Sequence, residues 1–438
     1  MKDRLKKAAL LALAAVCAAV FCGCDGIITT PDNLLNPPAL TGDMSPISQA
    51  LAESIKEDYT FVYPSSGDIR SAIALEDVDG DGVKEAFAFY STKNGEGTDM
   101  HINYVKKVEG KWRSLADNAI TAGGVEKVLF CDLSGNGKKE ILVGWEVYGT
   151  SEKKLGIYSA ADDQLTERFM REYTTFTCYD FSGGGKQQKL VLQYLNPDDY
   201  SNIVSVYALT ANSVNRTAGC LLDGKVKSAA EPLASKLSDG TAALFIDEEK
   251  GAGMITEVLF MKEGKLVNPL LDEEKGENTV TQRNSGIVCT DIDSDGSPEI
   301  PVFAEAPNAD TSGEKIYFTN WCAFDGEMLN VKITSVMNQT DGYYLVLPPA
   351  FIDGIAVSRN TEQRSRTFYE YDRETGRTGR KMFSLTALEI GKYEKYAKAN
   401  PNARVVYEDE QTVFVTEIFP GGAKLSLYDI KEMFRIIE

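Results

Sequence analysis

Two segments of this 438-residue chain alternate carboxylates in a pattern suited to a hard divalent cation. They read DVDGDGVKE over residues 77–85 and DIDSDGSPE over residues 291–299. Three carboxylates within five residues repel one another unless a cation neutralises them. Glycine at position six permits a sharp turn, and the carbonyl at position seven adds an oxygen. The pattern therefore predicts two calcium sites, against the alternative of acidic turns without an ion. The ligands predicted at positions one, three, five and seven are Asp77, Asp79, Asp81 and Val83, and Asp291, Asp293, Asp295 and Ser297.

The residues on both sides of each loop have the composition of strands. An EF-hand would need a helix after the loop and a glutamate at position 12, where the first loop has Ala88. Similar strand-loop-strand segments begin at Ile73, Val128, Phe176 and Ile287, and a degenerate copy begins at Ala243. Their leading aspartates stand at positions 77, 132, 180, 291 and 247. These intervals are close to the length of one four-stranded propeller blade.

Each repeat unit also contains a second turn between apolar runs, as at Glu109-Gly110 and Asp162-Asp163. Two hairpins in each unit supply the four strands of a blade. After Asn338 the acidic loop disappears but strand patterns continue, and they predict a sixth blade that begins at Tyr343. We therefore expect an all-β protein, a β-propeller of six or seven blades over residues 45–388 with short flanking helices. Residues 389–438 are expected to close the propeller with a strand and a helix.

The DxDxDG loops between strands resemble those of the FG-GAP and VCBS-type repeats, the integrin-α-like propeller family, which includes lipoproteins of Gram-positive bacteria. The resemblance covers residues 59–340 at the level of the repeat. It implies calcium binding through position nine as well, which adds Glu85 and Glu299 to the ligands. The copy with Asp132, Ser134, Asn136 and Glu140 leaves a weakly bound ion and an empty loop as alternatives. The copy at Asp180 has too few carboxylates and is expected to be closed by hydrogen bonds.

The N-terminus has the form of a bacterial lipoprotein signal. Basic residues precede the apolar run from Ala8 to Phe21, which is shorter than the about 20 residues needed to span a bilayer. The run ends in FCGC, which resembles a lipobox with Cys24 as the lipidated residue. We expect a signal peptide over residues 1–23, a proline-rich tether over 24–44, and a lipid anchor to the cell membrane on its extracytoplasmic side. The alternative is an ordinary cleaved signal with incidental cysteines.

Charge and composition exclude several classes of function. The net charge is −19, and it becomes −22 when residues 1–23, with four basic residues and one acidic residue, are removed. Such an acidic body is a poor partner for phosphate backbones, which excludes nucleic-acid binding. The five cysteines after Cys24 form no CxxC pair and are expected to be small core side chains, with a disulfide as the alternative. A single histidine, His101, argues against His-dependent triads and His-rich metal sites.

No catalytic pattern stands outside the acidic loops. We therefore expect a non-catalytic surface module that binds an envelope glycan or protein through the loops of a propeller face. A polysaccharide lyase or glycosidase is the first alternative, and it would need two carboxylates on different blades. A structural envelope protein without a ligand is the second alternative. An aromatic-lined pocket would favour a binding module over a structural protein.

Overall fold

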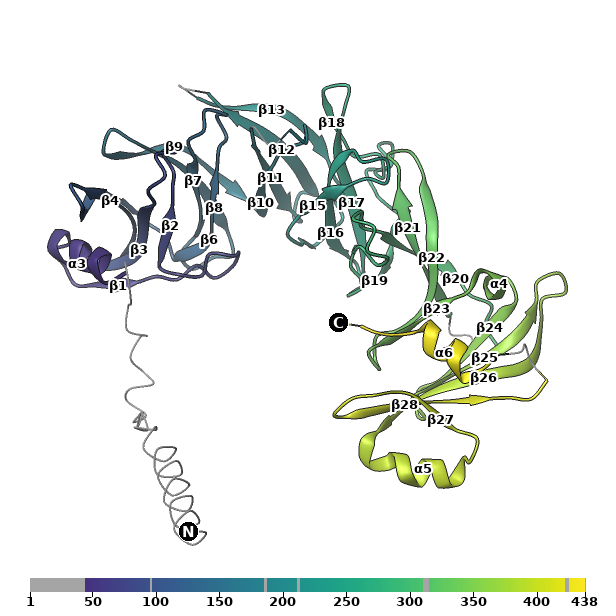
Figure 1. Ribbon diagram of the computed structural model, residues 1–438. Coiled ribbons are helices and arrows are strands. Elements are labelled where there is room, and N and C mark those ends of the chain that lie inside the picture. The colour runs from purple at the N-terminus through teal and green to yellow at the C-terminus, as the bar shows by residue number, and fades with distance from the viewer. Residues whose placement is uncertain are drawn as a thin grey trace, which may run out of the picture.

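The described residues form six antiparallel β-sheets that follow one another along an arc (Figure 1). The computed structural model describes residues 44–94, 97–184, 187–210, 213–309, 315–421 and 425–437. The first and sixth sheets lie at the two ends of the arc in this view. The prediction of an all-β protein with short flanking helices is confirmed.

The first three sheets contain the first three repeat copies. The first sheet holds β1 (Tyr59–Phe61), β2 (Ile73–Glu76), β3 (Glu85–Asn94), β4 (Gly97–Val108) and β5 (Lys111–Ile120). The second holds β6 (Gly124–Cys131), β7 (Glu140–Glu146), β8 (Lys153–Ala161) and β9 (Gln164–Tyr173). The third holds β10 (Thr175–Tyr179), β11 (Lys189–Asn196), β12 (Ser201–Leu209) and β13 (Val214–Leu221). The second and third sheets each pair their four strands in sequence order, as expected for a blade.

The later sheets depart from that simple order. The fourth holds β14 (Ser228–Ala229), β15 (Leu233–Lys236), β16 (Ala242–Lys250), β17 (Gly253–Lys262), β18 (Lys265–Val267) and β19 (Arg283–Asn284). The fifth holds β20 (Ile300–Glu305), β21 (Tyr317–Phe324), β22 (Leu329–Asn338), β23 (Tyr343–Leu347) and β29 (Phe434–Ile436). The sixth holds β24 (Ile355–Asn360), β25 (Ser365–Asp372), β26 (Arg377–Glu389), β28 (Thr412–Ile418) and β27 (Arg404–Glu408).

The strand that begins at Tyr343 does not start the sixth sheet as predicted. It pairs with β22 and belongs to the fifth sheet, because only one turn separates the two strands. The strand predicted within residues 389–438 is present as β28, and it pairs with β26 inside the sixth sheet. Residues beyond 389 are therefore divided between the fifth and sixth sheets.

A shared irregularity supports the repeat. In four sheets the register shifts between two neighbouring strands, β4–β5, β8–β9, β12–β13 and β21–β22, at Tyr104/Val105, Ile157/Tyr158, Val206/Tyr207 and Trp321/Cys322. In the first, second and fifth sheets, the residue after the shift pairs with the residue that follows the loop glutamate. A β-bulge at the same place in several units indicates a repeated design and increases the local twist of each sheet.

The hairpin turns follow the predicted chemistry. Glu109 and Gly110 have φ of 51° and 78°, and Asp162 and Asp163 have φ of 52° and 59°. Positive φ at both central residues is the type I′ geometry that matches the twist of the flanking strands. The turn at Asp325-Gly326 is longer, since Phe324 pairs with Leu329.

The helices cover the ends of the sheets. They are α3 (Met44–Ser54), α4 (Pro349–Ile352), the 3₁₀ helix η1 (Ile390–Lys392), α5 (Tyr393–Ala399) and α6 (Leu427–Met433). α3 buries Ile47, Ala50 and Leu51 against the first sheet. No helix in the described ranges is long and apolar enough to cross a membrane.

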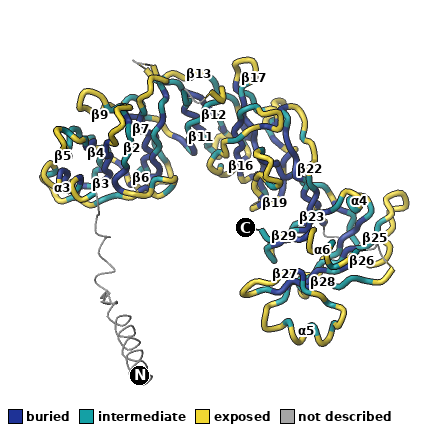
Figure 2. The backbone as a smooth tube through the Cα atoms, viewed as in Figure 1, coloured by how far each residue is buried: buried dark blue, intermediate teal, exposed yellow. Residues whose placement is uncertain are grey.

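The buried side chains lie mainly where neighbouring sheets face each other (Figure 2). Phe89 of the first sheet and Trp145 of the second meet with ring centroids 6.4 Å apart. Val204 of the third sheet and Leu259 of the fourth share another buried cluster. Each sheet therefore buries its apolar face on a neighbour, as expected for stacked repeats.

A disulfide joins Cys131 at the end of β6 to Cys178 in β10, with Cα atoms 6.5 Å apart. The prediction that all five cysteines are unpaired core side chains is wrong for this pair, because neighbouring leading strands bring the two residues together. Cys289 and Cys322 are buried and free, as predicted, and Cys220 is free and half-buried.

Candidate functional site

The first acidic loop is folded around the carboxylate of Asp77. Its two oxygens accept hydrogen bonds from the backbone nitrogens of Gly80 at 2.8 Å and Gly82 at 3.0 Å. Gly82 has a φ of +86°, a conformation that suits glycine and allows the sharp turn. Ligand atoms from Asp77, Asp79 and Glu85 lie within 4.8 Å of one another. Three of the five predicted ligands therefore converge in a geometry that suits a divalent cation.

The second acidic loop, residues 291–299, has the same fold. The backbone nitrogen of Gly296 donates to Oδ2 of Asp291 at 2.9 Å, and Gly296 has a φ of +90°. Here the converging ligand atoms come from Asp291, Asp293 and Asp295. Glu299 is not part of this group, so the two loops bring together different subsets of their predicted ligands.

The glutamate at position nine is buried in both loops. Glu85 and Glu299 are each fully buried, and each accepts the backbone N–H of position two, from Val78 and from Ile292, at 3.1 Å. Their other oxygens, Oε1, have no hydrogen-bond partner among the described residues. Burial raises the pKa of Glu85, and it raises that of Glu299 to about 7. Oε1 of Glu85 faces the ammonium of Lys106 at 3.5 Å, whereas Oε1 of Glu299 has no donor and indicates room for a cation at the second loop.

A lysine from another strand reaches each of these loops. Lys106 of β4 forms a close ion pair with Asp79 and lies 3.5 Å from Glu85 and 3.9 Å from Asp81. Lys332, in the bulge of β22, lies 2.9 Å from Asp293 and also pairs with Asp295. The contacts of both lysines with the loops were not predicted from the sequence, because only the strand pairing brings these lysines to the loops. One ammonium opposes four carboxylates in each loop, so a net negative charge remains.

The degenerate copies carry fewer charges. Asp132 accepts the N–H groups of Gly135 and Gly137 at 2.6 and 2.8 Å, and Glu140 accepts that of Leu133 at 2.9 Å. Ser134 donates to Asp132, and Asn136 accepts the N–H of Lys138, so the predicted weak ligands serve as turn acceptors and donors. Burial raises the pKa of Glu140 to about 7.

Asp180 and Asp247 differ from the full loops and from each other. Asp180 is bonded by Ser182 through both its backbone N–H and its hydroxyl, which agrees with the expected closure by hydrogen bonds. Asp247 lies in the middle of β16, opposite Thr256, and pairs with the buried Arg283 at 2.7 Å. The degenerate copy therefore keeps its two strands, β16 and β17, and has no acidic loop after Asp247.

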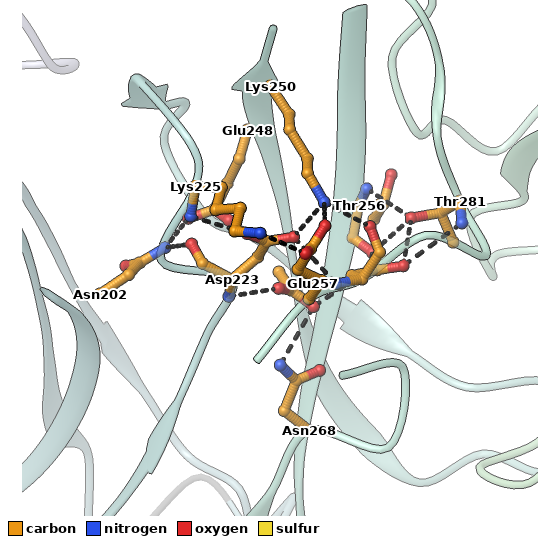
Figure 3. Close-up of polar contacts among 11 residues, drawn as sticks. Asn202, Asp223, Lys225, Glu248, Lys250, Thr256, Glu257, Asn268 and Thr281 are labelled. Carbon is orange, nitrogen blue, oxygen red and sulfur yellow. Dashed lines mark hydrogen bonds and ion pairs between the residues drawn. The ribbon is translucent and has the colours of Figure 1, made fainter. Parts of the chain in front are cut away.

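A network of buried charges joins the third and fourth sheets (Figure 3). Lys250 of β16 pairs with the buried Asp223 at 2.6 Å, and the backbone N–H of Asp223 donates to Glu257 at 2.9 Å. Oε1 of Glu248 accepts from Asn202 at 2.9 Å and from Gln193 of the third sheet at 2.6 Å. Burial raises the pKa of both Glu248 and Glu257. The network links the two sheets, because its donors and acceptors come from both.

His101 lies between a hydroxyl and a carboxylate. Its Nε2 is 3.0 Å from Oγ1 of Thr92, and its Nδ1 is 3.0 Å from Oδ2 of Asp117. The one histidine of the chain is therefore hydrogen-bonded through both ring nitrogens. Thr92 is 6% exposed, and the three residues come from adjacent strands of one sheet. This chain of hydrogen bonds ties β3, β4 and β5 together.

A cavity is lined by residues of the third and fourth sheets and of the loops beside them. Its volume is about 1120 Å³, and its walls include Tyr200, Leu221, Lys225, Leu266 and Asn268. Tyr200 is 68% exposed and Leu221 is 62% exposed. An exposed aromatic ring and an exposed apolar side chain beside polar groups are typical of a ligand site.

Two tryptophans lie in the core, and the N-terminal segment lies outside the described residues. Trp145 and Trp321 are buried core residues, with hydrogen bonds to Tyr158 and Ser335. The signal peptide, Cys24 and the tether to residue 43 lie outside the described residues.

The chain matches no protein-family model and no curated protein sequence. Among solved structures, it is 12% identical to an exotype rhamnogalacturonan lyase with a TM-score of 0.29, over 74% of this chain and 65% of that one. It is 10% identical to the Bacillus licheniformis rhamnogalacturonan lyase with a TM-score of 0.30, over 73% and 83%. It is 10% identical to the Pseudomonas aeruginosa periplasmic gluconolactonase with a TM-score of 0.27, over 68% and 82%. Similarity of this size assigns the chain neither to a family nor to a function.

Proposed function

We propose that this protein is a lipoprotein anchored through Cys24 to the outer side of the cell membrane, with a calcium-stabilised propeller that binds envelope glycan and performs no chemistry. The observation that carries the binding role is the cavity of about 1120 Å³ with Tyr200 exposed on its wall. An exposed tyrosine presents a flat apolar ring and a polar hydroxyl, which suits the faces and edges of sugars.

Calcium is proposed as the ion of both full loops. The converging carboxylates and the buried Oε1 atom of Glu299 support this assignment. Oxygen ligands at flexible loop positions favour calcium over transition metals, which favour nitrogen and sulfur. Because the loops end the leading strands, the ions would stabilise sheet edges and leave the binding surface to other residues.

The Cys131–Cys178 disulfide supports an extracytoplasmic location, since disulfides persist in oxidising compartments. The repeated four-stranded units and their shared bulges support a propeller in which the six sheets are blades.

The test is retention of the full chain on immobilised envelope polysaccharide, measured for wild type, Tyr200→Ala and Tyr148→Ala. Tyr148 is the matched control, because it is 77% exposed but does not line the cavity. We expect wild type and Tyr148→Ala to be retained equally and Tyr200→Ala to bind at least tenfold more weakly. Absence of retention of wild type would exclude glycan binding. Soluble sugar fragments released during the incubation would show that the protein is an enzyme.

A further inference from the structure

A second cavity lies between the second and third sheets. Its volume is about 530 Å³, and its walls include Arg171 of β9 together with Tyr194, Ile203 and Ser205 of the third sheet. We call it the Tyr194 cavity, and we call the cavity of about 1120 Å³ described above the Tyr200 cavity. The third sheet lies between the second and the fourth along the arc, so it has one cavity on each side (Figure 1).

A row of apolar side chains across the third sheet connects the two cavities. Tyr194 of β11 pairs in register with Ile203 of β12, and Ile203 pairs with Leu221 of β13. Residues paired in this way lie side by side on one face of the sheet. Tyr194 lines the first cavity, Leu221 lines the Tyr200 cavity, and Ile203 lines both. Neighbouring strands lie about 4.8 Å apart, so the row spans about 10 Å and joins the cavities into one groove.

The next row on the same face is hollow. Leu192 of β11, Ser205 of β12 and Gly219 of β13 pair in register. The side chains of this row become smaller from strand to strand toward β13, the edge of the sheet. Ser205 lines the Tyr194 cavity and Gly219 lines the Tyr200 cavity. The decreasing side-chain size therefore leaves room beside the apolar row at the point where the two cavities meet.

The guanidinium of Arg216 lies over this hollow row. Its Nε donates a hydrogen bond to Oγ of Ser205 at 3.0 Å. A Cβ atom at Gly219 would meet Nη2 of Arg216 at 2.0 Å, so the glycine is what allows the guanidinium to lie against β13. Arg216 is an exposed residue. Because a guanidinium carries five N–H donors in one plane, Arg216 can hold Ser205 and also donate to the hydroxyls of a ligand in the groove.

The shape and chemistry of the groove define the form of its ligand. An apolar floor with a tyrosine at each end suits the faces of sugar rings, and a planar donor beside the floor suits their hydroxyl edges. The two cavities together exceed the about 300–1,000 Å³ of a site for a drug-sized molecule. A single sugar would leave most of this groove empty. A chain of sugar units is the form of glycan that fills it.

We propose that the groove binds a linear chain of several sugar units that crosses the third sheet from one cavity to the other. Tyr200 contacts one end of the bound segment and Tyr194 contacts the other, while Arg216 donates hydrogen bonds to the units between them. The inference rests on the proposed glycan-binding function. It adds a second contact region to that site and specifies an oligosaccharide chain as the ligand.

The test is calorimetric titration of the full chain with fragments of envelope polysaccharide, prepared by partial acid hydrolysis and separated by size into disaccharides and octasaccharides. A disaccharide can occupy only one cavity, whereas an octasaccharide can occupy both at once. One molecule that engages two linked sites binds about 10²–10⁴ times more tightly than it binds either site alone. We therefore expect wild type to bind octasaccharides at least about a hundredfold more tightly than disaccharides.

Variants of the groove separate its two ends. Tyr194→Ala and Arg216→Gln should each reduce the advantage of octasaccharides at least about tenfold, because each removes one contact of the long ligand. Both should leave disaccharide binding at the Tyr200 cavity unchanged, which also shows that they fold. Tyr200→Ala should weaken disaccharide binding itself. The controls Tyr148→Ala and Arg380→Gln change exposed residues outside both cavities and should behave as wild type.

Equal affinities of wild type for disaccharides and octasaccharides would confine the glycan to one cavity. The groove inference would then fail, and the proposed function would stand. A preference for octasaccharides that persists in full in both Tyr194→Ala and Arg216→Gln would show that the chain leaves the Tyr200 cavity in another direction, which also overturns the inference. If wild type is not retained on any polysaccharide, the proposed function itself fails.

Discussion

The Nζ atom of Lys106 lies 3.5 Å from the buried Oε1 of Glu85. This ammonium comes from β4, and it faces the same group of carboxylates that would hold a cation. Its hydrogen bond to Asp79 raises the pKa of Lys106, so the side chain stays charged over the accessible pH range. A cation in this loop must therefore compete with Lys106 or displace it.

Calcium should stabilise the protein through both full loops. Extracellular sites bind calcium at about 10⁻⁴–10⁻³ M, so 1 mM calcium adds about 1.4 kcal/mol at a site with a Kd of about 0.1 mM. Asp79→Asn and Asp293→Asn should each remove one such increment. Thermal melts in calcium and in chelator measure this. An identical calcium response in wild type and the double variant would contradict the assignment of both loops.

Replacement of Lys106 by methionine should tighten calcium binding at the first loop. The variant removes the competing ammonium but keeps a side chain of similar length, so the four carboxylates attract the ion more strongly. Direct titration with calcium should give a lower Kd for Lys106→Met than for wild type. Lys111→Met, at an exposed lysine of β5, is the control and should behave as wild type. A weaker or unchanged affinity in Lys106→Met would show that the lysine does not oppose the ion.

Loss of the disulfide should destabilise the protein strongly. The bridge closes a loop with a sequence separation of 47 residues, for which chain entropy predicts about 4 kcal/mol. Cys131→Ser should therefore lower the melting temperature well below that of Cys220→Ser, which changes a free cysteine. Peptide mapping without reductant should recover Cys131 linked to Cys178. Recovery of the two cysteines as free thiols would contradict the bridge.

Stability should depend on pH through Glu140. In the unfolded chain this carboxyl ionises near 4.5, whereas burial raises its pKa to about 7 in the fold. Its contribution is therefore complete below pH 4.5 and is lost as the pH rises through 7. The shift corresponds to about 3 kcal/mol. Denaturation of wild type and Glu140→Gln at pH 5 and pH 8, in chelator, should show a smaller loss in the variant. Parallel losses in the two proteins would assign the pH dependence to other groups.

Removal of only one partner of the buried ion pair between the third and fourth sheets should destabilise the protein strongly. Lys250→Met leaves Asp223 buried without its cation, which costs about 3–5 kcal/mol. Lys225→Met, at an exposed lysine that pairs with Glu277, should cost far less, because solvent screens an exposed ion pair. Urea denaturation of the two variants measures the difference. Similar losses would show that the buried network does not bear on stability.

The features that could be predicted from the sequence are those formed by residues close together in the chain. The carboxylates of residues 77–85 are brought together by a turn within nine residues, and the hairpin at Glu109-Gly110 needs only its own two residues and their neighbours. The positions of Lys106 and Lys332 follow from strand register, and a bulge decides where Lys332 points. A composition pattern contains no signal of that kind.

The disulfide depends on the packing of neighbouring sheets. Cys131 and Cys178 each stand within two residues of a loop aspartate, and this spacing was the available signal for their pairing. The copy at Asp247 has the strands of a repeat without its loop chemistry, and the long β16–β17 hairpin takes the place of the loop.

The return of β29 to the fifth sheet has a consequence for how the protein is made. Residues Phe434–Ile436 pair with Tyr343–Leu345. All strands of the sixth sheet must therefore be synthesised before the fifth sheet can gain its last strand. During synthesis the fifth sheet would first form with β23 exposed as an edge, which is open to mispairing until β29 pairs with it. Folding of this half of the molecule is therefore coupled to the synthesis of β29 rather than to the order of the repeats.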